Sequence, residues 1–136
     1  MAREEMDMVY PMGELPEFYD CIEKAWGRKF LTREVVLTGK QIYHMNFEEP
    51  HHPLSYDQYG HYIPEILRNP DYIMEGSRGC CLVLKEIGED YFTLVLWIKP
   101  TEEPASYKNS VHTFYRMGRA KWNQFIRNKK ILYKRV

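Results

Sequence analysis

The fold is decided by two apolar runs, Cys80-Cys-Leu-Val-Leu-Lys-Glu-Ile87 and Tyr91-Phe-Thr-Leu-Val-Leu-Trp-Ile98, which Gly88-Glu89-Asp90 joins. Each run has the length of a strand, and the short polar segment between them contains a glycine, as hairpin turns often do. Their nearly continuous hydrophobicity indicates strands that are covered, at least in part, on both faces. We therefore expect a central hairpin around which the rest of the chain packs.

The chain after this hairpin predicts two more strands and one helix. Residues 99–109 are polar and contain two prolines, which indicates a loop. An apolar stripe predicts a helix over residues 118–129, and residues 131–133 predict a short final strand. Residues 110–117 have a period of two and predict a third strand, with Val111, Thr113, Tyr115 and Met117 on one side and His112, Phe114 and Arg116 on the other.

The chain before the hairpin is mainly helical in pattern. Residues 1–12 look irregular, and residues 14–26 predict a short helix that a glycine ends. Residues 35–37 are either a short strand or an extended lead-in. Thr38 then predicts the N-cap of a helix to about residue 47, with Gln41 completing a capping box. His44 lies in this helix, so a regular element fixes its direction.

Two more helical segments are expected between this helix and the hairpin. Ser55 with Gln58 is a second capping-box candidate. Pro64 suits the first turn of a helix that ends at residue 67 or 68. Helices early and strands late indicate an α+β fold, with N-terminal helices packed on an antiparallel sheet of about four strands and a C-terminal helix.

The length, the cysteines and the N-terminal sequence indicate the number of domains and the cellular compartment. A chain of 136 residues predicts one domain over 1–136, which we divide into an N-terminal helical extension (1–30) and a core (31–136). Three cysteines are an odd number, and Cys80 and Cys81 are adjacent in an apolar run, which favours reduced thiols in the cytoplasm. The acidic N-terminus lacks the apolar region of a signal peptide, and no apolar run approaches the roughly 20 residues of a membrane span.

The formal net charge of zero hides an uneven distribution. Seven acidic residues fall between Arg3 and Lys24, whereas no acidic residue follows Glu103. A segment of one sign is typical of a surface that binds a polyanion, and it is equally typical of a solvated helix face. The basic residues of this segment are Lys108, Arg116, Arg119, Lys121, Arg127, Lys129, Lys130, Lys134 and Arg135.

Four of the five histidines fall within eighteen positions, at His44, His51, His52 and His61. Imidazole exchanges protons near neutral pH, so the cluster indicates acid–base chemistry, metal ligation or a solvated loop. Adjacent residues such as His51 and His52 point opposite ways on an extended chain, and no zinc-type spacing accompanies them. We therefore expect no metal and no cofactor, and we interpret His61 and His112 as structural or exposed.

Other enzyme classes lack their sequence signatures. Each cysteine lies in or beside an apolar stretch, which favours inert burial. No Gly-x-Ser-x-Gly elbow and no glycine-rich phosphate loop occurs in the sequence. The residues that are present match metal-free cleavage of RNA. That reaction needs a base, an acid and cations near the phosphate, and the histidines and the basic segment can supply these groups.

Four segments in order resemble one nuclease family. They are Val35-Val-Leu-Thr-Gly-Lys-Gln-Ile-Tyr-His44 with Pro50-His-His-Pro53, then Ile63-Pro-Glu-Ile-Leu-Arg-Asn-Pro-Asp-Tyr-Ile73, Tyr107-Lys-Asn-Ser-Val-His-Thr-Phe114 and Ile131-Leu-Tyr-Lys134. Over about residues 31–134 they are similar to phage-encoded nucleases of the barnase–EndoU–colicin–RelE-like group. The resemblance implies helices that lead into a curved antiparallel sheet and a metal-independent ribonuclease site.

The resemblance also implies roles for individual residues. His44 and His52 match the two family histidines, and Thr113 matches the strand threonine. His51 stands where the family often has arginine, which leaves open which of His51 and His52 acts; Arg116 or Arg119 is then the substitute phosphate donor. We expect His44 and His52 to share the acid and base roles, with Thr113 and Arg116 holding the phosphoryl oxygens. The expected RNA-binding residues are His51, Lys99, Lys108, Arg119 and Lys121.

The resulting hypothesis is a toxin-like endoribonuclease of a phage or mobile element that acts on structured RNA, such as tRNA, in the cytoplasm of a bacterial host. Its expected partners are RNA and an immunity or antitoxin protein, with no membrane. Two alternatives stay open from the sequence. One is a catalytically inactive module that binds RNA or protein on the same fold, and the other is a virion structural protein.

Overall fold

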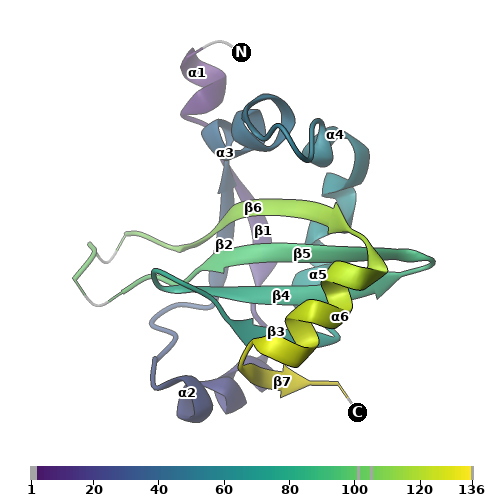
Figure 1. The fold of residues 1–136 in the computed structure, drawn as a ribbon. Coiled ribbons are helices and arrows are strands. Elements are labelled where there is room, and N and C mark those ends of the chain that lie inside the picture. The colour runs from purple at the N-terminus through teal and green to yellow at the C-terminus, as the bar shows by residue number, and fades with distance from the viewer. Residues whose placement is uncertain (1–2, 101, 105, 136) are drawn as a thin grey trace.

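The computed structural model describes residues 3–100, 102–104 and 106–135, which form an α+β fold with one seven-stranded sheet. The strands lie in the order β1-β2-β6-β5-β4-β3-β7 (Figure 1). Neighbouring strands are antiparallel except β2 and β6, which are parallel. The strands are β1 (Val9–Glu14), β2 (Glu34–Thr38), β3 (Tyr72–Glu75), β4 (Cys80–Ile87), β5 (Asp90–Trp97), β6 (Asn109–Met117) and β7 (Ile131–Lys134).

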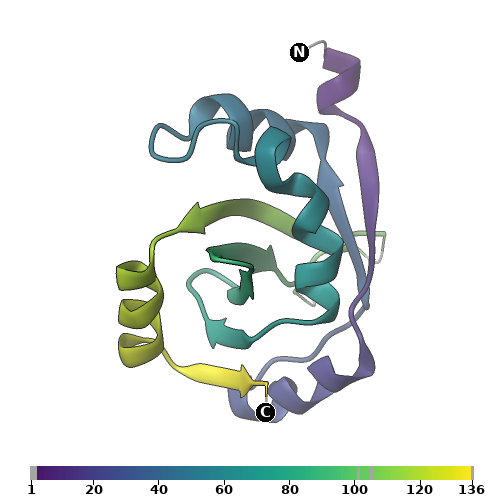
Figure 2. The ribbon, with the colours of Figure 1, turned by 90° about the vertical axis from the view of Figure 1, so that its right-hand side faces the viewer.

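The helices lie on both faces of this sheet and beside β6. Figure 2 shows α6 on one face and α5 on the other, while α3 and α4 lie along the free side of β6. Among the residues described, no helix is long and apolar enough to cross a membrane. The helical elements are α1 (Arg3–Met6), η1 (Glu17–Tyr19), α2 (Asp20–Trp26), α3 (Gly39–Tyr43), η2 (His44–Glu48), α4 (Ser55–Tyr59), η3 (Gly60–Tyr62), α5 (Ile63–Arg68) and α6 (Arg119–Asn128).

The central hairpin forms as the sequence predicts. β4 and β5 pair in register from Cys80 opposite Trp97 to Ile87 opposite Asp90. Each face of the hairpin is covered by a separate set of side chains, which explains the continuous apolar runs. One face carries Val83, Phe92 and Leu94 toward the larger core, and the other carries Leu84 into a smaller core with Trp122 of α6.

The expectation of about four strands is wrong, because β1, β2 and β3 join the sheet. β1 falls where the sequence looks irregular, since it contains Pro11 and Gly13 and its register shifts between them. Proline is tolerated there because β1 is an edge strand. β2 is a strand rather than a lead-in, and its Val35 and Val36 pair with Asn109 and Ser110.

The N-terminal segment is part of the core rather than a helical extension. β1 completes one edge of the sheet, and Leu15, Tyr19 and Ile22 are each at most 2% exposed. The Tyr19 hydroxyl donates a hydrogen bond of 2.7 Å to the carbonyl of Leu67. The division at residue 30 is therefore not a structural boundary.

The two capping predictions have different outcomes. Thr38 caps α3 as expected, because its Oγ1 accepts from the Gln41 N–H at 3.2 Å. Ser55 does not act as an N-cap: it lies inside α4, after Leu54 in a left-handed conformation with φ 58°. Its hydroxyl instead donates to the carbonyl of Met45 at 3.2 Å and so joins α4 to η2.

Candidate functional site

A bulge in β6 turns two neighbouring side chains to the same face of the sheet. Val95 pairs with Thr113 and Leu96 with Val111, so His112 has no partner in the register. Val111 and Phe114 are both fully buried in the larger core although they are three positions apart. The strict alternation expected for residues 110–117 is therefore wrong, and His112 and Thr113 together line a cavity on the opposite face.

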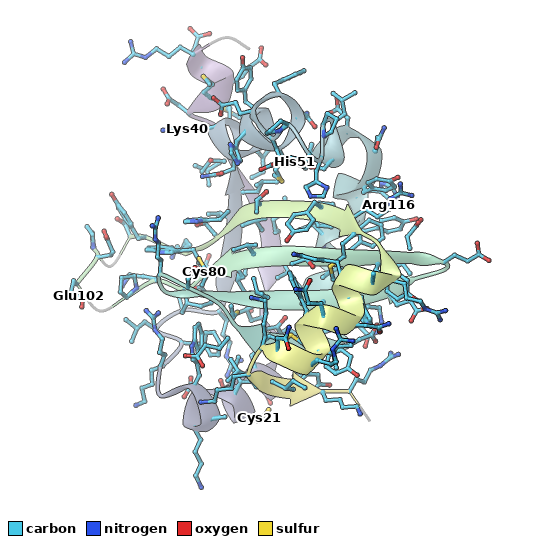
Figure 3. All side chains as sticks on the ribbon, in the orientation of Figure 1. Cys21, Lys40, His51, Cys80, Glu102 and Arg116 are labelled. Atoms are coloured by element: carbon cyan, nitrogen blue, oxygen red, sulfur yellow. The ribbon has the colours of Figure 1, made fainter. Side chains whose placement is uncertain are left out.

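We call this hollow the His44 cavity; its volume is about 610 Å³. Leu82, Val95 and Trp97 line it from the sheet, and Ser77 and Arg78 from the turn between β3 and β4. On the helical side it is lined by Lys40, Gln41, His44 and Glu48. Figure 3 shows Lys40 on α3 beyond β6 and Cys80 at the start of β4, on two sides of this region.

A π-helical turn positions His44. α3 changes at His44 into η2, whose five residues form such a turn, a rare element that is often found at functional sites. The Nδ1 atom of His44 lies 3.5 Å from Oε1 of Glu48. A carboxylate beside Nδ1 helps to orient the ring, and its negative charge faces the imidazole.

Buried polar contacts anchor this turn to α4. Asn46 is 5% exposed, and its Nδ2 donates to Oδ1 of Asp57 at 3.0 Å. The Asp57 N–H donates in return to Oδ1 of Asn46 at 3.1 Å. With the Ser55 hydroxyl on Met45, three hydrogen bonds hold η2 in place, so His44 extends from a well-supported backbone.

His112 lies against aromatic and thiol groups in the same cavity. Its ring is parallel to Trp97, with the ring centroids 6.1 Å apart and the planes at 3°. Its Nδ1 lies 4.0 Å from Sγ of Cys80. His112 is an exposed residue, but burial of part of its ring lowers its pKa below the ordinary value, so the neutral imidazole predominates at neutral pH. The alternating pattern gave no signal for this placement, which depends on the bulge.

The thiol of Cys80 is not an activated nucleophile. Burial raises the pKa of this thiol, and the positive charge of Arg28 opposes the rise only in part. The thiolate is the reactive form of cysteine, so a protonated Cys80 is a poor nucleophile at neutral pH. Cys81 faces the larger core, and its burial raises the pKa of its thiol even further.

Two cations lie at the same cavity. Lys40 and Arg78 are both exposed, and neither forms an ion pair with another residue that the structure describes. The cavity therefore combines two imidazoles, a carboxylate, two hydroxyls and two unpaired positive charges. This set can transfer protons and bind an anion.

His52 and Arg116 line a different and smaller cavity of about 250 Å³, which we call the His52 cavity. The ring of His52 stacks on Tyr115, with centroids 4.3 Å apart and planes at 17°. Burial lowers the pKa of His52, with the charge of Glu49 opposing and that of His51 adding to the effect. Arg116 lies 3.2 Å from Oδ1 of Asp90 and over the ring of Tyr59.

The four expected catalytic residues thus fall into two pairs. His44 and Thr113 line the His44 cavity, whereas His52 and Arg116 line the His52 cavity. Figure 3 shows His51 beside β6 and Arg116 near the C-terminal end of that strand. His112, rather than the expected His52, lines the same cavity as His44 and Thr113.

The expected RNA-binding residues do not gather on one surface. His51 lines the His52 cavity, and Lys99 is only 7% exposed, with its Nζ 3.5 Å from the carbonyl of Pro100. Lys108 forms an ion pair of 2.7 Å with Glu34. The remaining two have partners near α6: Arg119 donates to the Tyr91 hydroxyl at 3.1 Å, and Lys121 lies over the Phe125 ring.

Within the described ranges, no three or more histidine, cysteine or acidic side chains gather as ligands for a metal ion. No protein-family model, curated protein or solved structure matches the chain. The resemblance to phage-encoded nucleases therefore stays a prediction from the sequence.

Proposed function

We propose that the protein is a metal-independent endoribonuclease of a phage or mobile element that acts on structured RNA in the cytoplasm of a bacterial host. The observation that carries the proposal is the presence of His44 and His112 in one open cavity, with Thr113 and two unpaired cations beside them. A pair of histidines supplies both a base and an acid at neutral pH.

The reaction that suits this set is attack by a ribose 2′-OH on the neighbouring phosphorus. His112 takes the 2′-OH proton, because a neutral imidazole is required of a base and partial burial lowers the pKa of this ring. His44 gives a proton to the departing 5′ oxygen, and Glu48 offsets the charge of its protonated form. The P–O bond to the 5′ oxygen breaks as the bond to the 2′ oxygen forms, which yields a 2′,3′-cyclic phosphate and a 5′-OH.

The charge that builds on the phosphoryl oxygens needs donors in fixed positions. The Thr113 hydroxyl lines the cavity from β6 and donates to one of these oxygens. Lys40 and Arg78 add positive charge from α3 and from the turn before β4. His52 and Arg116 bind the substrate further along β6 in this scheme, because they line a second cavity to which Arg116 contributes from the same strand as Thr113.

The first test is incubation of the purified protein with total RNA in the presence of EDTA. We expect discrete RNA fragments, which disappear in a His44→Gln/His112→Gln double variant that retains the far-UV circular dichroism of the parent. His61→Gln is the matched control, since His61 is exposed and lies on η3 outside both cavities. Intact RNA at high protein concentration contradicts the proposal.

A binding module without turnover is the second candidate. It is favoured by the distribution of the expected catalytic residues over two cavities rather than one. Such a module would retain RNA in a salt-dependent manner, because each phosphate contact releases counterions. RNA binding that weakens with salt, together with an absence of fragments, would support it over the nuclease.

A further inference from the structure

We propose that a hollow beside the His44 cavity binds a nucleobase, next to the phosphate on which the histidines act. We call this hollow the Tyr107 cavity; its volume is about 450 Å³. The choice of a nucleobase as ligand rests on the proposed function. The proposed reaction involves only the ribose and the phosphate, and this hollow is where the attached base would bind.

The Tyr107 cavity lies beside the His44 cavity, because Trp97 and His112 line both hollows. The rings of these two residues are parallel, with their centroids 6.1 Å apart. A ribose and its phosphate in the first hollow therefore place the attached base in the second.

The lining of this hollow suits a flat aromatic ring. Its walls include Val9, Val36, Trp97 and Tyr107, which offer apolar surface and two aromatic side chains. Val9 is 56% exposed and Tyr107 is 50% exposed, so large apolar side chains face solvent here without a cover from the described residues. Bases stack on such aromatic faces in proteins that bind single-stranded nucleic acid.

The polar groups at this hollow are those that hydrogen-bond the edge of a base. Ser106 and Ser110 add two hydroxyls, and Glu103 adds a carboxylate. Lys108 is held by Glu34 at 2.7 Å, so its charge is already compensated. An uncharged, hydrogen-bonding and planar ligand fits this chemistry better than a second phosphate does.

The test measures binding of 2′-O-methylated dinucleotides of each base, which lack the attacking hydroxyl and stay intact. Binding is followed by isothermal titration calorimetry and by quenching of tryptophan fluorescence, with Trp97→Phe identifying the signal from this site. Loss of one base–aromatic stacking contact, about 1–3 kcal/mol, corresponds to a roughly 5- to 150-fold weaker Kd. We expect that loss in Tyr107→Ala.

Phe47→Ala is the matched control, since Phe47 is 62% exposed and lines neither hollow. Equal affinity of Tyr107→Ala and the parent, or no binding by the parent, overturns the base site. So does a concentration-dependent dimer that Tyr107→Ala abolishes, because a second copy would then cover this surface.

The two proposals fail separately in these experiments. Dinucleotide binding that depends on Tyr107, without any RNA cleavage, leaves the base site standing and removes the nuclease. RNA cleavage by a Tyr107→Ala variant with unchanged KM leaves the nuclease standing and removes the base site. Where both hold, Tyr107→Ala raises KM and leaves kcat close to that of the parent.

Discussion

Nδ1 of His112 lies 4.0 Å from Sγ of Cys80, on the wall of the cavity that His44 also lines. The contact joins the start of β4 to the bulge of β6 across the intervening strand β5. It gives the cavity a thiol and an imidazole side by side. Burial raises the pKa of the thiol and lowers that of the imidazole, so the uncharged form of each predominates at neutral pH.

The three cysteines should differ in their rate of alkylation. Cys21 is exposed, whereas Cys80 and Cys81 are buried, and burial raises the pKa of both buried thiols. At pH 7.5 we expect iodoacetamide to label Cys21 first, Cys80 slowly and Cys81 only after unfolding. Peptide mass spectrometry over time measures the order, and labelling of Cys80 ahead of Cys21 would show that the pair with His112 forms an activated thiolate.

The stability of the fold should decrease as the pH falls below about 6.5, the ordinary pKa of histidine. Burial lowers the pKa of His112 and of His52, so the unfolded chain binds more protons than the folded chain in this range. The stabilising contribution is complete above pH 6.5 and is lost as the pH approaches the lowered values. Urea unfolding at pH 5.5 and 7.5 measures it.

A His52→Gln/His112→Gln variant should lose part of this pH dependence, and His61→Gln should serve as the control for removal of an exposed histidine. An equally steep decline in the double variant and the parent would assign the effect to other groups.

Removal of the Glu48 charge should slow RNA cleavage while the fold stays intact. Glu48→Gln keeps the size of the side chain and removes the carboxylate that lies 3.5 Å from His44 Nδ1. We expect kcat to fall about tenfold or more, because a partner that orients a histidine commonly contributes that much. Both groups are partly exposed, so the melting temperature should change little. Glu65→Gln, at an exposed residue of α5 that lines neither cavity, is the control.

Substitution of Ile22 should destabilise the whole domain. Its side chain is fully buried in the larger core, and Ile22→Ala should reduce the free energy of unfolding by about 2–5 kcal/mol. Lys24→Ala, on the exposed side of the same helix, is the control. Equal unfolding curves for Ile22→Ala and the parent would mean that α2 is a separate appendage after all.

The elements that sequence patterns predict are those with local signals. β4 and β5 are continuous apolar runs in the sequence, and α6 has an apolar stripe with the period of a helix. The cap at Thr38 is a local hydrogen bond. β1 was missed because its place at the edge comes from pairing with β2, and Pro11 and Gly13 hide the strand. The position of His112 was missed because a bulge reverses the side on which it lies, and a bulge is fixed by pairing with β5.

The candidate site likewise combines features that have a local sequence signal with features that depend on long-range packing. The cap at Thr38 is confirmed, but the expected helix to about residue 47 is α-helical only as far as Tyr43, and His44 is the first residue of the π-helical turn that follows. The meeting of His44 with Thr113 requires the long-range packing of η2 on β6. His52 stacks on Tyr115 and lines a separate cavity, and the sequence carries no signal for either placement.

The most direct measurement incubates a structured RNA such as a tRNA with the protein in EDTA and identifies the ends of the fragments by mass spectrometry. We expect fragments with a 2′,3′-cyclic phosphate at one end and a 5′-OH at the other, and a loss of at least about a hundredfold in rate in His44→Gln and in His112→Gln. Unchanged rates in both variants, other chemical ends on the fragments, or no cleavage by the parent would contradict a nuclease site at His44 and His112.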